Sequence, residues 1–248
     1  MTLQEFFTLH SKVAIAFSGG VDSAFLLYAA LKYAKTVGAY YVKSQFQPAF
    51  EMEDAIRLAD QLNVKMKILH LDVLLLSCVS QNPPDRCYHC KKAIFNAITG
   101  AASQDGFPVL CDGTNASDDA GDRPGMRALK ELSVLSPLRE CGLTKTQIRQ
   151  LSGEAGLFTW DKPAYACLAT RIPTGETITT QKLSATEEAE NYLFSLGFTD
   201  FRVRSQDGHA RLQVPEAQLE LVLRHRKDIL ARLQALYKTV SLDLAART

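Results

Sequence analysis

The fold of this 248-residue chain is decided by the stretch Val13-Ala14-Ile15-Ala16-Phe17-Ser18-Gly19-Gly20-Val21-Asp22-Ser23. Its apolar first half is typical of a buried strand and the apolar run 24–31 behind it of a helix, so the glycine pair predicts a tight strand-to-helix turn. Glycines let a backbone approach a ligand, and a helix N-terminus attracts anions. Asp22 would repel a phosphate unless a divalent cation lay between them. The stretch therefore predicts a phosphate-binding turn that works with Mg²⁺.

A plain connecting turn is the simpler interpretation of this stretch. Two serines and an aspartate are not needed to turn a chain, which favours the ligand-binding interpretation. The stretch also differs from the Walker A pattern, in which Gly-Lys-Ser/Thr follows four intervening residues.

The six residues Ser18–Ser23 match the SGGxDS signature of the PP-loop ATP pyrophosphatases, which this chain resembles. Members of that family cleave ATP between the α and β phosphates, release pyrophosphate and leave an adenylated substrate. The resemblance implies ATP and Mg²⁺ as ligands, with Asp22 as the first metal contact. It leaves open which substrate is adenylated.

Strands and helices are expected to alternate over the first part of the chain. Further strands are expected at 37–43, 66–71 and 107–111, and helices at 50–62, about 87–102 and 144–155. This order predicts an α/β fold with a parallel sheet covered on both faces. Ligands bind such sheets at the carboxyl ends of the strands, so we expect Ser18–Ser23, the loop before Cys87 and Asp112–Asn115 to share one rim.

The pattern changes after a Pro- and Gly-containing loop at 160–177. A helix is expected at 179–196, strands at 200–205 and 210–214 around the turn Asp207-Gly208, a helix at 215–235 and a strand at 239–244. We therefore expect two domains: a Rossmann-like PP-loop domain over 1–177 and a small α+β domain over 178–248, suited to substrate binding or oligomerisation.

The composition is ordinary for a globular protein, with 46% hydrophobic and 22% charged residues and a formal net charge of +1. That charge gives no overall attraction for nucleic acid, so no nucleic-acid partner is expected. The first residues lack the pattern of a secretory signal, and no apolar run is long enough to span a bilayer. A cytoplasmic location without membrane contact is expected, where the six cysteines favour metal or redox chemistry over disulfides.

The segment Cys87-Tyr88-His89-Cys90 lies at a predicted helix start. Such a CxxC could be a redox dithiol, half of a zinc site or part of an iron–sulfur site. Cys167 lies in a loop that gives little packing reason for a thiol, and three thiolates can hold a [4Fe–4S] cluster with one iron left open. Cys78 and Cys111 lie in apolar runs and are expected in the core, and Cys141 in a loop.

Arginines supply the candidate anion ligands. Arg202 and Arg204 are two residues apart on a predicted strand, so their side chains should share one face and could bind a phosphate. A solvated strand face is the alternative. Arg123 and Arg127 are weaker candidates of the same kind, since a surface arginine is the commoner explanation.

Four segments together resemble the LarE-type ATP-dependent sulfur transferases: Ser18–Ser23, Arg86-Cys87-Tyr88-His89-Cys90-Lys91, Gly113-Thr114-Asn115 and Ala166-Cys167-Leu168-Ala169-Thr170-Arg171-Ile172-Pro173. That family converts the carboxylates of a pyridinium dicarboxylate mononucleotide to thiocarboxylates for the nickel-pincer nucleotide cofactor. Some members sacrifice a cysteine at the position of Cys167. Others carry three cysteines and a [4Fe–4S] cluster, and this chain resembles the second group.

The resemblance implies a set of site residues and partners. The substrate would be a small-molecule mononucleotide, and a homo-oligomer is expected. Glu190 would lie near the substrate or metal, and Gln213 stands where the family often has Glu. Catalytic roles fall to Cys167, Cys87, Cys90 and Asp22, iron–sulfur ligation to the three cysteines, magnesium binding to Asp22, and ligand binding to Ser18, Gly19, Gly20, Asp22, Ser23, Gly113, Asn115, Arg171, Arg202 and Arg204, with Lys91 as a weaker candidate.

Several alternatives remain open at this stage. A PP-loop tRNA thiolase can also use three cysteines and a cluster, although it would predict a basic RNA-binding segment. An ammonia-using ligase of the NAD-synthetase kind would share the turn but not the cysteines. A sacrificial-cysteine enzyme would use Cys167 itself as sulfur donor, and a non-catalytic nucleotide or iron–sulfur module would release no pyrophosphate.

Overall fold

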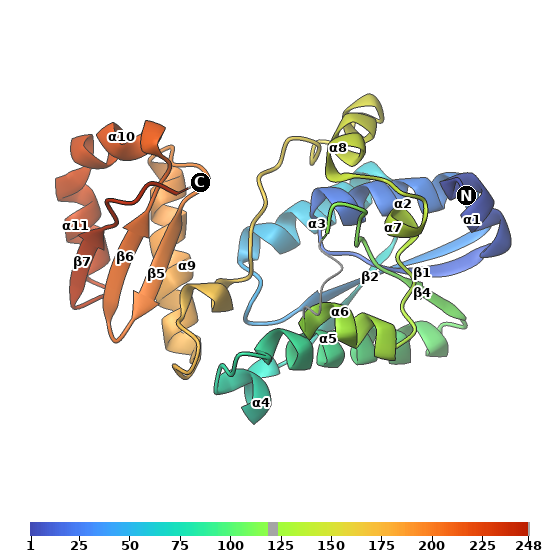
Figure 1. Cartoon of the computed structure of the whole chain (residues 1–248), viewed down its shortest axis with the longest axis horizontal. Helices are drawn as coiled ribbons and strands as arrows, with labels where there is room; N and C mark the ends of the chain where they lie inside the picture. The colour runs from blue at the N-terminus through green and yellow to red at the C-terminus, as the bar shows by residue number, and fades with distance from the viewer. Residues whose placement is uncertain (119–123, 248) are drawn as a thin grey trace. The chain divides into compact units, whose positions relative to one another are not determined.

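The computed structural model describes residues 1–118 and 124–247 (Figure 1). It divides into two compact units, the first formed by Met1–Val73 and Asp85–Lys162, the second by Leu74–Pro84 and Pro163–Thr248. The expected boundary between a PP-loop domain and a small α+β domain, at residues 177 and 178, stays a prediction.

The first unit is built on a four-stranded sheet of order β3-β2-β1-β4. Its strands are β1 (Lys12–Ala16), β2 (Thr36–Lys43), β3 (Met66–His70) and β4 (Val109–Cys111). All three pairings are parallel. The predicted α/β class is therefore confirmed, and β4 is shorter than expected because it begins two residues later.

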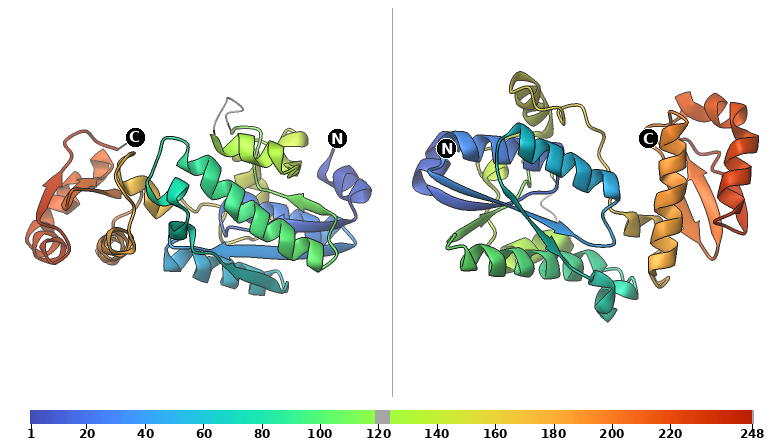
Figure 2. Two further views of the ribbon diagram at one scale, coloured as in Figure 1. Left: turned by 90° about the horizontal axis from the view of Figure 1, so that it is seen from below. Right: turned by 180° about the vertical axis from the view of Figure 1, so that it is seen from behind.

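Helices cover both faces of this sheet (Figure 2). One face carries α1 (Leu3–Leu9), α2 (Val21–Tyr33), α3 (Ala49–Gln61), α7 (Pro137–Glu140) and α8 (Lys145–Glu154), and the other carries α5 (Arg86–Gln104) and α6 (Pro124–Glu131). Side chains alternate along β1, so Val13 and Ile15 pack into the first layer and Ala14 into the second. Both faces are buried, as a parallel sheet requires.

The second unit contains a three-stranded sheet of order β5-β6-β7. Its elements are β5 (Arg202–Gln206), β6 (His209–Gln213), β7 (Thr239–Leu242), α4 (Ser77–Ser80), α9 (Thr180–Ser195), α10 (Leu219–Arg224) and α11 (Arg226–Gln234), with 3₁₀ turns at Leu168–Arg171 and Glu216–Gln218. β5 and β6 are antiparallel, and β6 and β7 are parallel. The hairpin turn has φ of 48° at Asp207 and 80° at Gly208, which suits its Asp-Gly sequence. The helix expected at 215–235 is instead broken near His225.

Residues 74–84 belong to the second unit, although the sequence places them before α5. The Asn82 side chain donates hydrogen bonds to the carbonyls of Ile172 (3.2 Å) and Pro173 (2.7 Å). The N–H of Gly175 donates to the Asn82 carbonyl at 2.8 Å. The segment is therefore fixed to the stretch that follows Cys167.

Two cysteine predictions are settled by burial. Cys111 is buried in the core, as expected, whereas the prediction for Cys78 is wrong because its side chain is exposed. Cys78 lies on the single turn α4, where Val79 is the buried residue. Among the described residues, no helix combines the length and apolar character that a bilayer span requires.

Candidate functional site

The turn after β1 is held in shape by its own serines. The Ser18 N–H donates to Ser23 Oγ at 3.2 Å, and the two hydroxyl oxygens are 3.0 Å apart. Ser23 Oγ in turn donates to the Gly20 carbonyl at 3.1 Å. Gly19 has φ of 75°, a conformation that favours glycine. The turn therefore presents the N-terminus of α2 in the geometry that an anion needs.

The loop after β4 lies against the Ser18–Ser23 turn, and both segments line one cavity. A Cβ atom at Gly113 would lie 2.9 Å from the backbone nitrogen of Ser23, so only glycine allows this close approach. Asp112 accepts hydrogen bonds from the hydroxyls of Thr114 (2.5 Å) and Ser136 (2.6 Å). Asn115 is buried, and its Oδ1 accepts the N–H of Ser117 at 2.8 Å. The predicted meeting of the two loops at one rim is confirmed.

Both loops line one cavity of about 330 Å³ in the first unit. Its polar wall includes Ser18, Gly20, Asp22, Ser23 and Asp112–Thr114. Its apolar wall includes Phe17, Val42, Ile94, Phe95 and Ile98, and Lys91 of α5 also lines it. Gly19 and Asn115 shape the two loops rather than contributing to this lining. The cavity thus combines a polar wall that could bind a phosphate with an apolar wall, a combination that suits a nucleotide.

Asp22 is the residue of this cavity that fits a divalent cation. Its Oδ1 is buried and has no hydrogen-bond partner, and its Oδ2 lies 2.5 Å from Nζ of Lys145. Carboxylate oxygens are the ligands that Mg²⁺ prefers. An unpartnered buried carboxylate oxygen is costly, and a bound cation would satisfy it.

Two residues at this cavity, Lys145 and Tyr41, were not predicted from the sequence. Lys145 is the first residue of α8, and its N–H donates to Ser117 Oγ at 2.9 Å. The helix start was predictable from Thr144, which forms a capping box with Gln147, but the approach to Asp22 depends on the tertiary fold. The Tyr41 hydroxyl is buried without a partner and lines the cavity. Burial, then the charge of Glu51, raises the pKa of Tyr41.

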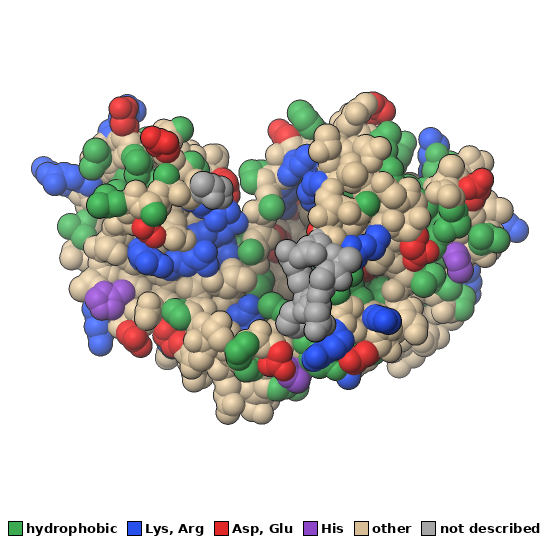
Figure 3. All heavy atoms as spheres, in the orientation of Figure 1, with side chains coloured by type: hydrophobic (Ala, Val, Ile, Leu, Met, Phe, Trp, Pro, Cys, Tyr) green, Lys and Arg blue, Asp and Glu red, His purple; other side chains and the backbone are tan. Residues whose placement is uncertain are grey.

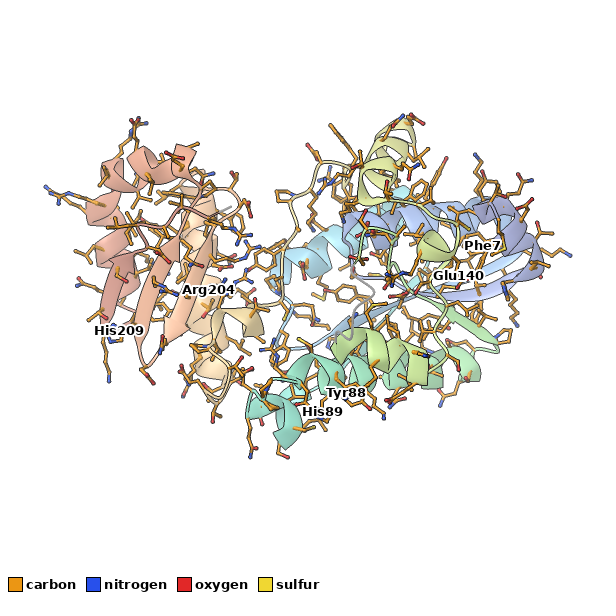
Figure 4. The ribbon with its side chains drawn as sticks, in the orientation of Figure 1. Phe7, Tyr88, His89, Glu140, Arg204 and His209 are labelled. Atoms are coloured by element: carbon orange, nitrogen blue, oxygen red, sulfur yellow. The ribbon has the colours of Figure 1, made fainter. Side chains whose placement is uncertain are left out.

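Cys87 and Cys90 lie on the first turns of α5 in the first unit. Three residues apart on a helix, they share a face, with Cys87 exposed and Cys90 half-buried. Figure 4 shows Tyr88 and His89 at the same helix start, where His89 Nε2 lies 3.1 Å from Asp85 Oδ2. Lys91, the next residue in the sequence after Cys90, lines the cavity of the first unit.

In the second unit, the Cys167 loop is organised around a buried ion pair. Arg171 and Glu190 are joined by two hydrogen bonds of 2.9 and 3.0 Å, and their side chains are 0% and 1% exposed. Arg171 also donates to the carbonyls of Ala166 (2.6 Å) and Cys167 (3.3 Å). Burial works against the charge of Arg171, but the hydrogen bonds and charge of Glu190 prevail and raise its pKa.

Arg202 and Arg204 contact the same loop from β5. Arg202 donates to the Ala164 carbonyl at 3.0 Å, and Arg204 donates to the Thr170 carbonyl at 2.6 Å and to Gln213 at 2.8 Å. Burial, then the charges of Arg171 and Arg247, lowers the pKa of both. Lys and Arg side chains gather over β5 and β6 of this unit (Figure 3). The cluster is thus positioned to attract an anion.

Arg127, Arg123 and the three-cysteine metal site are the remaining candidates predicted from the sequence. Arg127 stacks over the Tyr88 ring at 4.0 Å and lies 3.8 Å from Glu131, a surface arrangement, and Arg123 lies outside the described residues. Within 1–118 and 124–247, no three His, Cys, Asp or Glu side chains form a metal-binding group. Cys87 and Cys90 belong to one unit and Cys167 to the other, so the three-thiol site stays a prediction.

Comparison of the sequence with known proteins identifies the family of this chain. Residues 12–95 match the model of the queuosine biosynthesis protein QueC. An uncharacterized protein of Synechocystis is 36% identical over 88% of this chain and 82% of its own length. The pyridinium-3,5-bisthiocarboxylic acid mononucleotide synthase of Lactiplantibacillus plantarum is 34% identical over 94% of this chain and 86% of its own length.

A more distant similarity covers less of the chain. The tRNA-specific 2-thiouridylase MnmA of Thermotoga petrophila is 26% identical over 59% of this chain and 52% of its own length. The match to the synthase covers 94% of this chain and therefore includes both units. This chain therefore belongs to the LarE family of ATP-dependent sulfur transferases within the PP-loop superfamily.

Proposed function

We propose that this enzyme adenylates the carboxylates of pyridinium-3,5-biscarboxylic acid mononucleotide and converts them to thiocarboxylates, a step in nickel-pincer nucleotide biosynthesis. The observation that carries the proposal is the cavity between the Ser18–Ser23 turn and the Gly113 loop, in a chain that matches a synthase of the bisthiocarboxylic acid mononucleotide over 94% of its length.

ATP would bind with its phosphates on the turn and its adenosine against the apolar wall. The N–H groups at the start of α2 and the serine hydroxyls would face the phosphates, and Gly113 permits the close contact between the loops. Asp22 would hold Mg²⁺ through the oxygen that has no other partner. The ion would neutralise phosphate charge as pyrophosphate leaves.

The chain's own residues contribute mainly by positioning. An oxygen of the substrate carboxylate attacks the α-phosphorus, the bond to the β-phosphate oxygen breaks, and pyrophosphate leaves an acyl-adenylate. Donors fixed in advance, such as the α2 amides and Lys91, stabilise the developing negative charge without rearranging.

Arg202 and Arg204 are proposed to bind the phosphate of the mononucleotide. Burial, and then the charges of Arg171 and Arg247, lowers their pKa values, and an anion beside them would offset that repulsion. Guanidinium groups recognise phosphates in bidentate fashion. Their hydrogen bonds to the loop carbonyls would couple phosphate binding to the position of Cys167.

Sulfur is proposed to come from a [4Fe–4S] cluster held by Cys87, Cys90 and Cys167. None of the three cysteines forms a disulfide, and Cys87 and Cys90 share one helix face. Such a cluster, when bound, would supply a sulfide that replaces AMP on the acyl group. In the alternative, Cys167 gives up its own sulfur and becomes dehydroalanine.

One anaerobic experiment tests this function. The protein, reconstituted with iron and sulfide, undergoes a single turnover with ATP and the pyridinium dicarboxylate mononucleotide, and the protein and products are analysed by mass spectrometry. We expect AMP, pyrophosphate and a thiocarboxylate, with Cys167 intact. ADP instead of pyrophosphate would contradict adenylation, and dehydroalanine at Cys167 would identify the sacrificial route.

Cysteine variants separate the cluster from adventitious iron. Cys87→Ala should lose the visible absorption of the reconstituted protein, and Cys78→Ala, an exposed cysteine on α4, should keep it. Equal absorption of Cys87→Ala and wild type would reject the cluster.

A tRNA thiolase is the second candidate, supported by the similarity to MnmA. Replacing the mononucleotide by tRNA in the same turnover distinguishes the two, because thiolated tRNA would appear only if this candidate were right. A homo-oligomer in the cytoplasm completes the proposal, consistent with six cysteines that form no disulfide.

A further inference from the structure

Among the described residues, three carboxylates line the nucleotide cavity, and Asp22 differs from the other two. Asp112 accepts hydrogen bonds from two hydroxyl groups, and Asp118 Oδ2 accepts the N–H of Asn115 at 2.8 Å. Both are thus satisfied by neutral donors. Asp22 instead forms an ion pair of 2.5 Å with Lys145. In the described part of the cavity wall, Asp22 is therefore the carboxylate with a cation already beside it.

This ion pair satisfies only half of the Asp22 carboxylate. Oδ2 contacts the ammonium, whereas Oδ1 is buried without a partner. A purely structural ion pair would leave no reason to keep the second oxygen buried and unpaired, because that costs free energy. A cation at Oδ1 would lie close to the Lys145 ammonium, and two positive charges so near each other in a partly buried site repel strongly.

The backbone of Lys145 is fixed while its side chain is free to move. Its N–H is held by Ser117, and the helix start is held by the capping box of Thr144 and Gln147. Four carbons separate this anchored backbone from the ammonium, whose donors rotate easily. The side chain is 34% exposed, so a rotamer change toward its solvent-facing side is open to it. Phosphates bound on the Ser18–Ser23 turn would offer a displaced ammonium a new anionic partner.

We propose that Lys145 is a charge-exchange residue of the nucleotide site. Without nucleotide, its ammonium occupies the cation position beside Asp22. When ATP arrives with its divalent cation, the metal replaces the ammonium at Asp22, and Lys145 moves to the phosphates that leave as pyrophosphate. The exchange makes and breaks ionic contacts only. It rests on the proposed function solely in taking ATP and a divalent cation as the ligands of this cavity.

Two binding measurements test the proposal without any sulfur chemistry. Mn²⁺ binding to the nucleotide-free protein is followed by electron paramagnetic resonance, and binding of α,β-methylene-ATP with Mg²⁺ by calorimetry. For Lys145→Gln, we expect Mn²⁺ to bind about tenfold more tightly and the ATP analogue about tenfold more weakly, because the competing charge and the phosphate ligand are lost together.

Lys91→Gln is the matched control, because Lys91 lines the same cavity from α5 and is not the ion-pair partner of Asp22. It should weaken analogue binding and leave Mn²⁺ binding unchanged. Asp22→Asn should abolish Mn²⁺ binding. Lys145→Arg, which keeps the charge, should restore wild-type Mn²⁺ affinity, and circular dichroism verifies that each variant is folded.

The proposal is overturned if Lys145→Gln weakens both ligands, which a structural ion pair predicts, or changes neither. Neither measurement uses the mononucleotide or a sulfur donor. A failure of thiocarboxylate formation would therefore leave this result standing, and a failure here would leave the proposed function standing.

Discussion

Gly113 and Glu190 carry the largest structural consequences at the scale of single residues. Gly113 lies where the loop after β4 approaches the first turn of α2, with no room for a side chain. Glu190 accepts hydrogen bonds from Arg171, from the Tyr165 hydroxyl and from the N–H of Val203, so one carboxylate joins α9, β5 and the Cys167 loop. Each residue holds together segments that are distant in the sequence.

Gly113→Ala should lower stability by about 1–3 kcal/mol and weaken ATP binding, because its Cβ would be 2.9 Å from the Ser23 backbone nitrogen. Urea denaturation and calorimetry measure the two effects. Gly100→Ala is the control, since no atom lies within 4 Å of its added Cβ and alanine favours a helix. An equally stable Gly113→Ala protein would show that the two loops separate easily.

Glu190→Gln should destabilise the second unit by about 3–5 kcal/mol, because it leaves the buried Arg171 guanidinium without a counter-charge. Denaturation followed by circular dichroism measures the loss, and alkylation of Cys167 should become faster as its loop loosens. The control is Glu188→Gln, which removes an exposed ion pair with Arg232 and should cost less than about 1 kcal/mol. Equal effects of the two variants would contradict this role for Glu190.

The ends of elements show how one side chain joins a helix to a sheet. Asp105 is the C-cap residue of α5. It accepts hydrogen bonds from Lys67 of β3 at 2.8 Å and from Tyr40 of β2 at 2.7 Å. Those hydrogen bonds lower the pKa of Asp105 below its ordinary value of 3.8. The same contact, after burial, raises the pKa of Tyr40.

A lowered carboxyl pKa gives a definite pH dependence. The stabilisation by Asp105 is present above the pKa of the unfolded chain and disappears as the pH falls through the lower pKa of the folded protein. Asp105→Asn should therefore destabilise the protein at neutral pH and much less at about pH 2. Urea midpoints at the two pH values measure this, with Asp60→Asn, an exposed position on α3, as control. A destabilisation independent of pH would rule out the ionised contact.

Element prediction succeeded where a local pattern sufficed. Apolar runs and alternation located every strand of both sheets to within about two residues, and Thr144 marked the start of α8. The short helices α1, α4, α6 and α7, of four to eight residues each, were missed because so few residues carry little periodic signal and depend on packing. The break near His225 was also missed, and Val222 of α10 and Ile229 of α11 are buried in the same core on either side of it.

At the scale of the whole molecule, each unit has its own core and its own chemistry. The nucleotide cavity is built by residues of the first unit alone. The Cys167 loop, Arg202 and Arg204 belong to the second unit. ATP binding by itself should therefore stabilise the first unit selectively.

Hydrogen exchange tests this division. With α,β-methylene-ATP and Mg²⁺ at about 100 times the dissociation constant, amides of α2 and of the Gly113 loop should gain about 2.7 kcal/mol of protection. Amides of β5, β6 and β7 should be unchanged. Asp22→Asn is the control in which the protection is lost, and protection of β5–β7 by the analogue alone would contradict the division.

The α/β class, the strand-to-helix turn at Ser18–Ser23, the second sheet and the family could all be predicted from the sequence, because these follow from local patterns and from motifs of adjacent residues. Only the tertiary structure showed that Lys145 pairs with Asp22, that Glu190 joins Arg171 to β5, and that residues 74–84 pack with the second unit. Each of these contacts joins residues far apart in the chain. Their energies come from burial and charge at close range, which no local pattern encodes.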